Sequence, residues 1–334
     1  MTQENRHSLR RRRAACAFAL AASSVFLVQS AAAQEFPSKP VTLVVPFPPG
    51  SGPDFIARII SEKVSPKLGQ PILVESRPGV GGLAGANVVA RAVPDGHTLL
   101  VAPNTVAISS HVLPKGSGGG VDVLKDLVPI IKAASPPLVL VTNPQLGVKT
   151  PADLIAAAKR NPGLAYASAG NGSPQHFAGE LFKRATGVDM LHVPYKGQTP
   201  SVTETLGGQV KVLFVALSGV MGHIRSGKLV PLAVAEKQRT PIMPELPTLA
   251  EFGIKGVEVD AWLGVLAPAG TPTAIIARWN QEINAVVKMP DVRARLNGLG
   301  IDARGGTPEE FGATMREDHE RYGRIAQEFG IKAD

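Results

Sequence analysis

A strand, a turn rich in proline and glycine, and a helix follow one another between residues 41 and 60. Residues 41–45 form a short apolar run rich in valine, which is typical of a covered strand in a parallel sheet. The turn Gly50-Ser51-Gly52 follows several prolines, and Pro53 suits the first turn of the helix. The arrangement predicts unpaired backbone N–H groups at the end of a strand, where open α/β sheets bind ligands and helix N-termini bind anions.

The same arrangement occurs a second time in the middle of the chain. Residues 164–169 are a strand candidate, Gly170-Asn171-Gly172-Ser173-Pro174 is the turn, and an amphipathic helix follows. Two such turns, one in each half of the chain, indicate a ligand held between two lobes. The alternative is a pair of ordinary strand-to-helix turns in an α/β protein.

Strands and helices alternate along most of the chain, which favours mainly parallel sheets flanked by helices. We therefore expect an α/β protein with two lobes, the first formed by residues 34–137 and 263–334 and the second by residues 138–262. Asn104 and Thr105 form a polar turn after the strand predicted at residues 97–102, and they are a third candidate for the ligand site.

Residues 1–33 have the features of a secretory signal peptide. Arg6 and the four arginines at 10–13 precede an apolar stretch at 14–28 that is short for a membrane span, and small residues lie before Gln34. We expect cleavage after Ala33 and a periplasmic mature protein. The arginine run leaves twin-arginine export open beside the general route.

The leader also carries half of the formal net charge of +8, because it holds five arginines and one glutamate. The remaining positive excess is mild and suits an anionic ligand. Nucleic-acid binding needs a concentrated basic face, which the rest of the chain lacks in sequence, so we expect none. The single cysteine, Cys16, lies in the leader, so the mature chain has no disulfide. No later apolar run is long enough to span a membrane.

The residues expected of metal and nucleotide chemistry are missing from the sequence. We expect no metal, because there is no HExxH motif, no close pair of histidines and no cysteine after the leader. The glycines at 79–85 resemble a dinucleotide-binding pattern, but the acidic residue that such a site needs does not follow, and we expect no cofactor.

Two residue pairs have both a structural and a chemical interpretation. Ser173 and His176 have helical spacing and could imitate a nucleophile and its base, although a serine at a helix start is usually an N-cap. Asp54 either completes a capping box with Ser51 or accepts a hydrogen bond from an amine or hydroxyl of the ligand. We expect a protein that is not an enzyme, with an exported enzyme acting on a carboxylate as the alternative.

A series of motifs along the mature chain resembles the Bug/TctC family, the extracytoplasmic solute receptors of tripartite tricarboxylate transporters. The motifs, in order, are FPSKP (36–40), VVPFPPGSGPD (44–54), RPGVGG (77–82), PDGHTLL (94–100), SAGNGSPQHFAGELF (168–182), HVPYKG (192–197), GGQV (207–210), PELPTLAEFG (244–253), WLGVLAPAGTP (262–272) and TPEEF (307–311).

The resemblance implies a two-lobed periplasmic-binding-protein fold of type II that closes around a small carboxylate. It implies delivery to the membrane subunits of a transporter, although orphan receptors are common in the family, and a ligand sensor for a signalling partner is an alternative. We expect a monomer. The ligand-binding residues that the motifs imply are Gly50, Ser51, Gly52, Asp54, Asn104, Thr105, Ser168, Gly170, Asn171, Gly172 and Ser173, with His176 as a support of the second loop.

The sequence departs from the family pattern at two positions. Position 53 often carries a hydrogen-bond donor in relatives, whereas Pro53 has neither an N–H nor a hydroxyl group. The strand that contains Phe214 often continues with aspartate, whereas Val215 follows here. We therefore expect a less polar wall of the site and a preference for a less polar acid over citrate.

Overall fold

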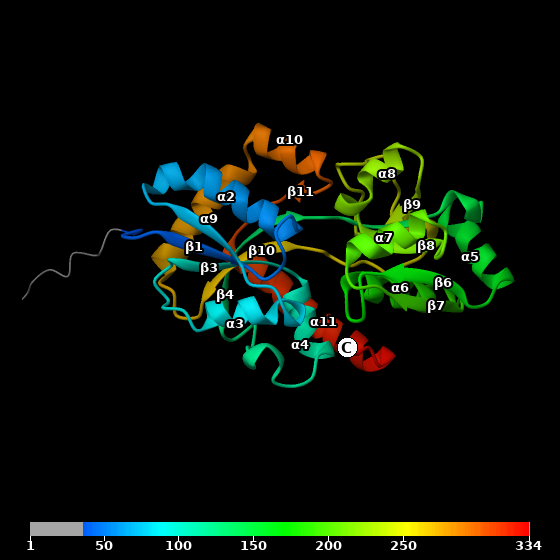
Figure 1. Cartoon of the computed structure of the whole chain (residues 1–334), viewed down its shortest axis with the longest axis horizontal. Helices are drawn as coiled ribbons and strands as arrows, with labels where there is room; N and C mark the ends of the chain where they lie inside the picture. The colour runs from blue at the N-terminus through cyan, green and yellow to red at the C-terminus, as the bar shows by residue number, and fades with distance from the viewer. Residues whose placement is uncertain (1–35, 334) are drawn as a thin grey trace, which may run out of the picture. The chain divides into compact units, whose positions relative to one another are not determined.

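The computed structural model describes residues 36–333 (Figure 1). The signal peptide predicted at residues 1–33 lies outside the described residues. The two β-sheets described below belong to one compact unit that begins at Lys39.

The first sheet has six strands, of which β1, β2 and β3 are parallel neighbours. The strand β10 pairs antiparallel with both β3 and β4, so this sheet is mixed. In sheet order, the strands are β11 (Asp302–Ala303), β4 (Leu127–Ser135), β10 (Leu263–Pro268), β3 (Thr98–Pro103), β1 (Val41–Val45) and β2 (Ile72–Ser76).

The second sheet has five strands and comes from one continuous part of the chain. Its strand β6 is parallel to β7 and β8, whereas β5 runs antiparallel to β8 and β9. In sheet order, the strands are β7 (Met190–Pro194), β6 (Leu164–Ser168), β8 (Val212–Ala216), β5 (Leu138–Thr142) and β9 (Val230–Val234).

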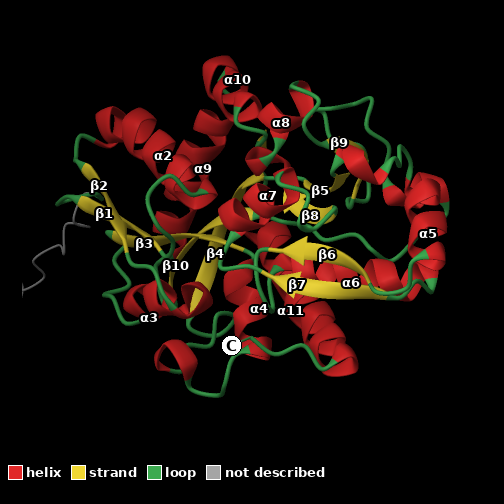
Figure 2. Cartoon of the chain, turned by 45° about the vertical axis from the view of Figure 1, so that its right-hand side comes forward, coloured by secondary structure: helices red, strands yellow, loops and turns green. Residues whose placement is uncertain are grey.

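Helices flank both sheets, as the alternation in the sequence predicts (Figures 1 and 2). Around the six-stranded sheet are α2 (Gly52–Leu68), α3 (Leu83–Ala90), α4 (Thr105–Val112), α9 (Thr273–Val287), α10 (Pro290–Gly298) and α11 (Pro308–Phe329). Around the five-stranded sheet are α5 (Pro151–Arg160), α6 (Pro174–Thr186), α7 (Gln198–Leu206) and α8 (Met221–Arg225).

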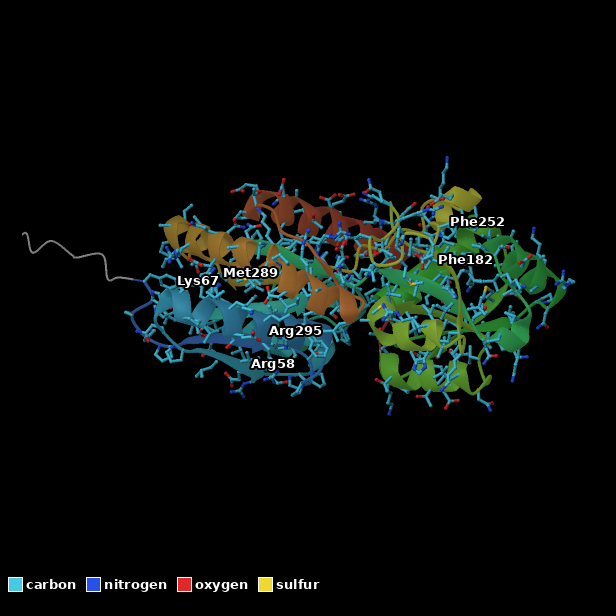
Figure 3. All side chains as sticks on the ribbon, turned by 90° about the horizontal axis from the view of Figure 1, so that it is seen from above. Arg58, Lys67, Phe182, Phe252, Met289 and Arg295 are labelled. Atoms are coloured by element: carbon cyan, nitrogen blue, oxygen red, sulfur yellow. The ribbon has the colours of Figure 1, made fainter. Side chains whose placement is uncertain are left out.

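Alternate residues of β5 enter separate cores on the two faces of the five-stranded sheet. Leu138 and Leu140 pack in a core with residues of α5 and α6, and Phe182 of this core is labelled in Figure 3. Val139 and Val141 pack in the other core with residues of α7 and α8. Because strand side chains alternate between faces, a run that is apolar at every position requires cover on both sides.

The last long helix, α11, contributes to the cores of both sheets. Phe311 and Met315 near its start pack with residues of β1 and β3. Tyr322 and Ile325 near its end pack with the five-stranded sheet and α6. The lobe boundaries expected from the sequence stay a prediction. Both α11 and α4 contribute side chains to the cores of both sheets.

The structure contains two helices and a short strand that the sequence patterns do not predict. The segment Thr105–Val112 reads as a polar turn followed by β-branched residues, yet it forms α4, because Val106 and Ala107 are buried against the six-stranded sheet and Ile108 and Val112 in the core of the five-stranded sheet. The helix α10 and the strand β11 were also not expected. Tertiary burial outweighs the weak helix propensity of valine, isoleucine and serine here.

Within residues 36–333, none of the helices combines the length and apolar character needed to cross a bilayer. The same residues contain no group of three or more histidine, cysteine, aspartate or glutamate side chains able to hold a metal ion.

Candidate functional site

The first candidate loop, residues 50–54 (loop 1), joins β1 to α2. Gly50 has a φ of 80°, which is a left-handed conformation that side chains disfavour. Ser51 occupies the N-cap position with an extended backbone, and Pro53 lies in the first turn, as predicted. The Ser51 hydroxyl is buried and has no hydrogen-bond partner among the described residues. A buried hydroxyl without a partner is costly, so a ligand atom is a natural partner for it.

The capping box predicted between Ser51 and Asp54 does not form, because the Ser51 side chain makes no cap bond. Asp54 Oδ2 instead accepts hydrogen bonds of 2.9 Å from the Gly50 N–H and from Arg58 Nε. Burial alone would raise the pKa of Asp54, but these hydrogen bonds and the charge of Arg58 together lower it. The carboxylate therefore stabilises the turn, while its second oxygen, Oδ1, is buried without a partner.

The second candidate loop, residues 168–173 (loop 2), joins β6 to α6 and is closed by its own hydrogen bonds. Ser173 Oγ donates to the Gly170 carbonyl at 2.7 Å and accepts from the His176 N–H at 3.2 Å. Ser173 is thus an N-cap, as its position in the sequence indicates, and not a nucleophile paired with His176. The Gly172 N–H donates to His176 Nδ1 at 3.2 Å, so this amide already has an acceptor.

Two stacked imidazole rings support loop 2 from behind. The rings of His176 and His192 have centroids 3.7 Å apart and an interplanar angle of 11°. Burial, together with neighbouring positive charge, lowers the pKa of each histidine to about 4. Both rings are therefore neutral near pH 7, and His176 Nδ1 keeps the lone pair that accepts from Gly172.

His192 is a residue that the sequence analysis did not assign to the site. Its Nε2 lies 2.6 Å from Ser168 Oγ, and its ring stacks on Tyr166. Ser168 and His192 lie on the neighbouring strands β6 and β7. The parallel register pairs Tyr166 with His192, and this register is the signal that could have revealed the contact. Ser168 is fully buried and also bonds to the backbone of Gly170, so the pair positions loop 2.

The third candidate, Asn104, is held by the chain that connects the two sheets. Its side-chain amide donates to the Asp260 carbonyl at 3.0 Å, and its backbone N–H donates to the Trp262 carbonyl at 3.1 Å. Asn104 is almost completely buried, whereas the neighbouring Thr105 is half-buried as the first residue of α4. Thr105 is therefore the more accessible member of this pair.

Loop 2 and α4 are in close contact at Gly172. A Cβ atom on Gly172 would lie 2.6 Å from Cγ2 of Val112, and the φ of this glycine is 71°. Glycine is thus required at this position by packing and by backbone conformation, before any ligand is considered. The contact links the second candidate loop to the helix that begins at the third.

Val215 belongs to the buried core under α7 and α8. The expectation of a less polar site therefore rests on Pro53. Two cavities of about 850 and 410 Å³ also occur, but neither is lined by a predicted site residue.

Comparison with known proteins places this architecture in a family. Residues 56–331 match the family model described as Tripartite tricarboxylate transporter family receptor, TctC. The chain belongs to the TctC family. Protein BugT of Bordetella pertussis (strain Tohama I) is 35% identical to this TctC protein over 303 residues, which is 90% of this chain and 92% of BugT.

Two solved structures of Rhodopseudomonas palustris proteins share the fold of this TctC protein and contain a bound acid. Rpa4515 with adipate has a TM-score of 0.79 and 32% identity, over 89% of this chain and 99% of that one. MatC with bound malate has a TM-score of 0.74 and 32% identity, over 87% of this chain and 99% of that one. The periplasmic binding protein BugD also shares the fold, with a TM-score of 0.75 and 29% identity over 90% of this chain and 100% of that one, so the fold is the two-lobed α/β fold of periplasmic binding proteins, as the motifs implied.

Proposed function

We propose that this TctC protein is a periplasmic receptor that captures a small carboxylate between loop 1 and loop 2 and delivers it to the membrane subunits of a transporter. The two relatives with bound acids support the ligand class, since one holds adipate and the other malate. The family description supports the transporter as partner. A signalling partner that senses the loaded receptor is the alternative partner.

The observation that carries the placement of the site is the unpartnered hydroxyl of Ser51 at the start of α2. A carboxylate there would accept a hydrogen bond from Ser51 Oγ and would lie at the positive end of the helix. The Asp54 carboxylate does not prevent an anion from binding nearby. Arg58 balances its negative charge, and Arg58 Nε and the Gly50 N–H both donate hydrogen bonds to its Oδ2 atom. On loop 2, the Ser173 hydroxyl and the Gly172 N–H already donate hydrogen bonds within the protein. Loop 2 would therefore contribute to ligand binding mainly through the shape of the site and through its remaining backbone groups.

We infer that the protein is not an enzyme. At loop 2 the Ser173 hydroxyl caps α6 and meets only the backbone N–H of His176, whereas Ser168, which lies beside the His192 ring, is fully buried in loop-closing bonds. Release of a chemically altered product after incubation of the purified protein with an acid would contradict this inference.

A thermal-unfolding assay with a panel of adipate, malate, citrate and an aromatic acid tests the ligand class. A ligand at a hundredfold its dissociation constant should add about 2.7 kcal/mol to the free energy of unfolding. We expect a larger shift with adipate or the aromatic acid than with citrate, because Pro53 removes one donor from loop 1. Stabilisation by none of these acids, together with stabilisation by another class of compound, would contradict the carboxylate assignment.

The variant Ser51→Ala tests the site itself. Because Ser51 Oγ is buried and makes no hydrogen bond within the described residues, its removal should not destabilise the free protein. We expect carboxylate affinity to fall about tenfold, which corresponds to the loss of one hydrogen bond to a charged group. The matched control is Ser226→Ala, whose hydroxyl bonds only to the carbonyl of His223. Equal affinity of both variants would remove loop 1 from the ligand site.

A further inference from the structure

A groove with a basic rim and an apolar floor runs between α6 and α11, away from the candidate loops. Its cavity has a volume of about 410 Å³. Leu181 and Ile325 form its floor, and the rim carries the cations Arg184, Lys255, Arg321 and Arg324. We refer to these six residues as the basic groove. Figure 2 shows α6 and α11 side by side.

The charges of the basic groove are only partly balanced. Arg184 pairs with Glu328 at 2.7 Å, and Glu328 is the only carboxylate among the residues that line the cavity. Arg324 approaches Glu320 no closer than 4.0 Å, and both side chains are 72% exposed. For Lys255, no ion pair is found within residues 36–333. The rim therefore carries an excess of positive charge that the protein itself does not neutralise.

We propose that the basic groove binds an acidic segment of a protein partner, in which an aliphatic side chain is flanked by carboxylates. The aliphatic side chain would cover Leu181 and Ile325, and the flanking carboxylates would pair with Lys255, Arg321 and Arg324. A single ion pair at an exposed site contributes about 0.2–1 kcal/mol, so one small anion would bind too weakly here. A peptide that carries several carboxylates and one aliphatic side chain would combine the small binding energies of several ion pairs with that of the apolar contact.

This surface is independent of the carboxylate site. It lies on the far end of α6 from loop 2, since Leu181 and Arg184 come in the second half of that helix. It also includes the end of α11, which packs against the core of the five-stranded sheet. A partner seated in the groove would thus contact α6, α11 and the segment at Lys255 at once.

Fluorescence anisotropy with a labelled peptide, in which leucine is flanked on each side by two glutamates, tests the proposal. The protein should bind this peptide at low salt, and the affinity should fall as added salt screens the charges. The double variant Lys255→Glu/Arg324→Glu should bind at least about tenfold more weakly, because two attractive contacts become repulsive. The matched control Lys228→Glu reverses an exposed charge outside the groove and should bind as the parent does.

Two further measurements separate the possible outcomes. The double variant should show the same thermal stabilisation by carboxylates as the parent, which establishes that it is folded and that the ligand site is intact. Peptide affinity that is equal in the parent and the double variant would overturn the proposal. Retention of the parent, but not the double variant, on phosphatidylglycerol vesicles without peptide binding would also overturn it, because the groove would then recognise a lipid surface.

Discussion

Replacement of Asp318 by asparagine should make the protein more stable at mildly alkaline pH. Asp318 lies on α11, is only 5% exposed, and accepts a hydrogen bond of 2.7 Å from Trp262 Nε1. Burial and, to a smaller extent, the negative charge of Asp260 raise the pKa of Asp318, whereas the Trp262 bond, Lys132 and Arg321 lower it, and the net result is a pKa of about 7. An asparagine keeps an acceptor oxygen for Trp262 and has no charge to bury.

The sign and size of the effect follow from the two pKa values. Since the folded pKa lies above the ordinary value of 3.8, the protonated carboxyl stabilises the folded state, and this contribution disappears as the pH rises through the folded pKa. One pKa unit corresponds to about 1.4 kcal/mol, so the complete loss is roughly 4 kcal/mol. About 2.5 kcal/mol of it should fall between about pH 5 and about pH 8.

Urea unfolding followed by circular dichroism at both pH values measures this difference. The free energy of unfolding of Asp318→Asn minus that of the parent should be about 2.5 kcal/mol larger at the higher pH than at the lower one. The control Glu317→Gln removes an exposed carboxylate on the same helix and should shift stability by less than about 0.5 kcal/mol at either pH. An unchanged difference between Asp318→Asn and the parent across this range would refute a raised pKa at Asp318.

Three further variants test individual contacts. His176→Phe removes the acceptor of the Gly172 N–H, and calorimetry should show carboxylate affinity reduced about tenfold; an unchanged affinity would mean that loop 2 does not need this bond. Thr150→Ala breaks the capping box of α5 and should lower the free energy of unfolding by about 1 kcal/mol while ligand affinity stays constant. Gly179→Ala would press a methyl group into the Tyr166 ring and should cost about 1–3 kcal/mol in urea unfolding; a neutral result would show that the ring can move aside.

The sequence alone determined the two strand–turn–helix units on which the candidate site is built. The apolar runs at β1 and β6, the glycines of the turns, and Pro53 and Pro174 at the helix starts are local signals, and both units form where they were predicted. The motifs also identified the family. Local signals suffice here because backbone conformation at a turn depends on the residues in that turn.

Only the tertiary structure decided which polar groups of those turns are already engaged. The position of Asp54 suggested a capping box with Ser51, but Arg58 and the Gly50 N–H engage its carboxylate and leave Ser51 Oγ without a partner. His192 supports loop 2 from the neighbouring strand, where only the sheet register brings it to Ser168.

The helix α4 shows the same limit for secondary structure. Its residues have weak helix propensity, and it forms because Val106 and Ala107 are buried against the six-stranded sheet. Gly172 lies in a glycine turn that the sequence predicts, but its close contact with Val112 on α4 could not be read from that turn. Such contacts join residues far apart in the chain, so their energies depend on packing that no local pattern of residues encodes.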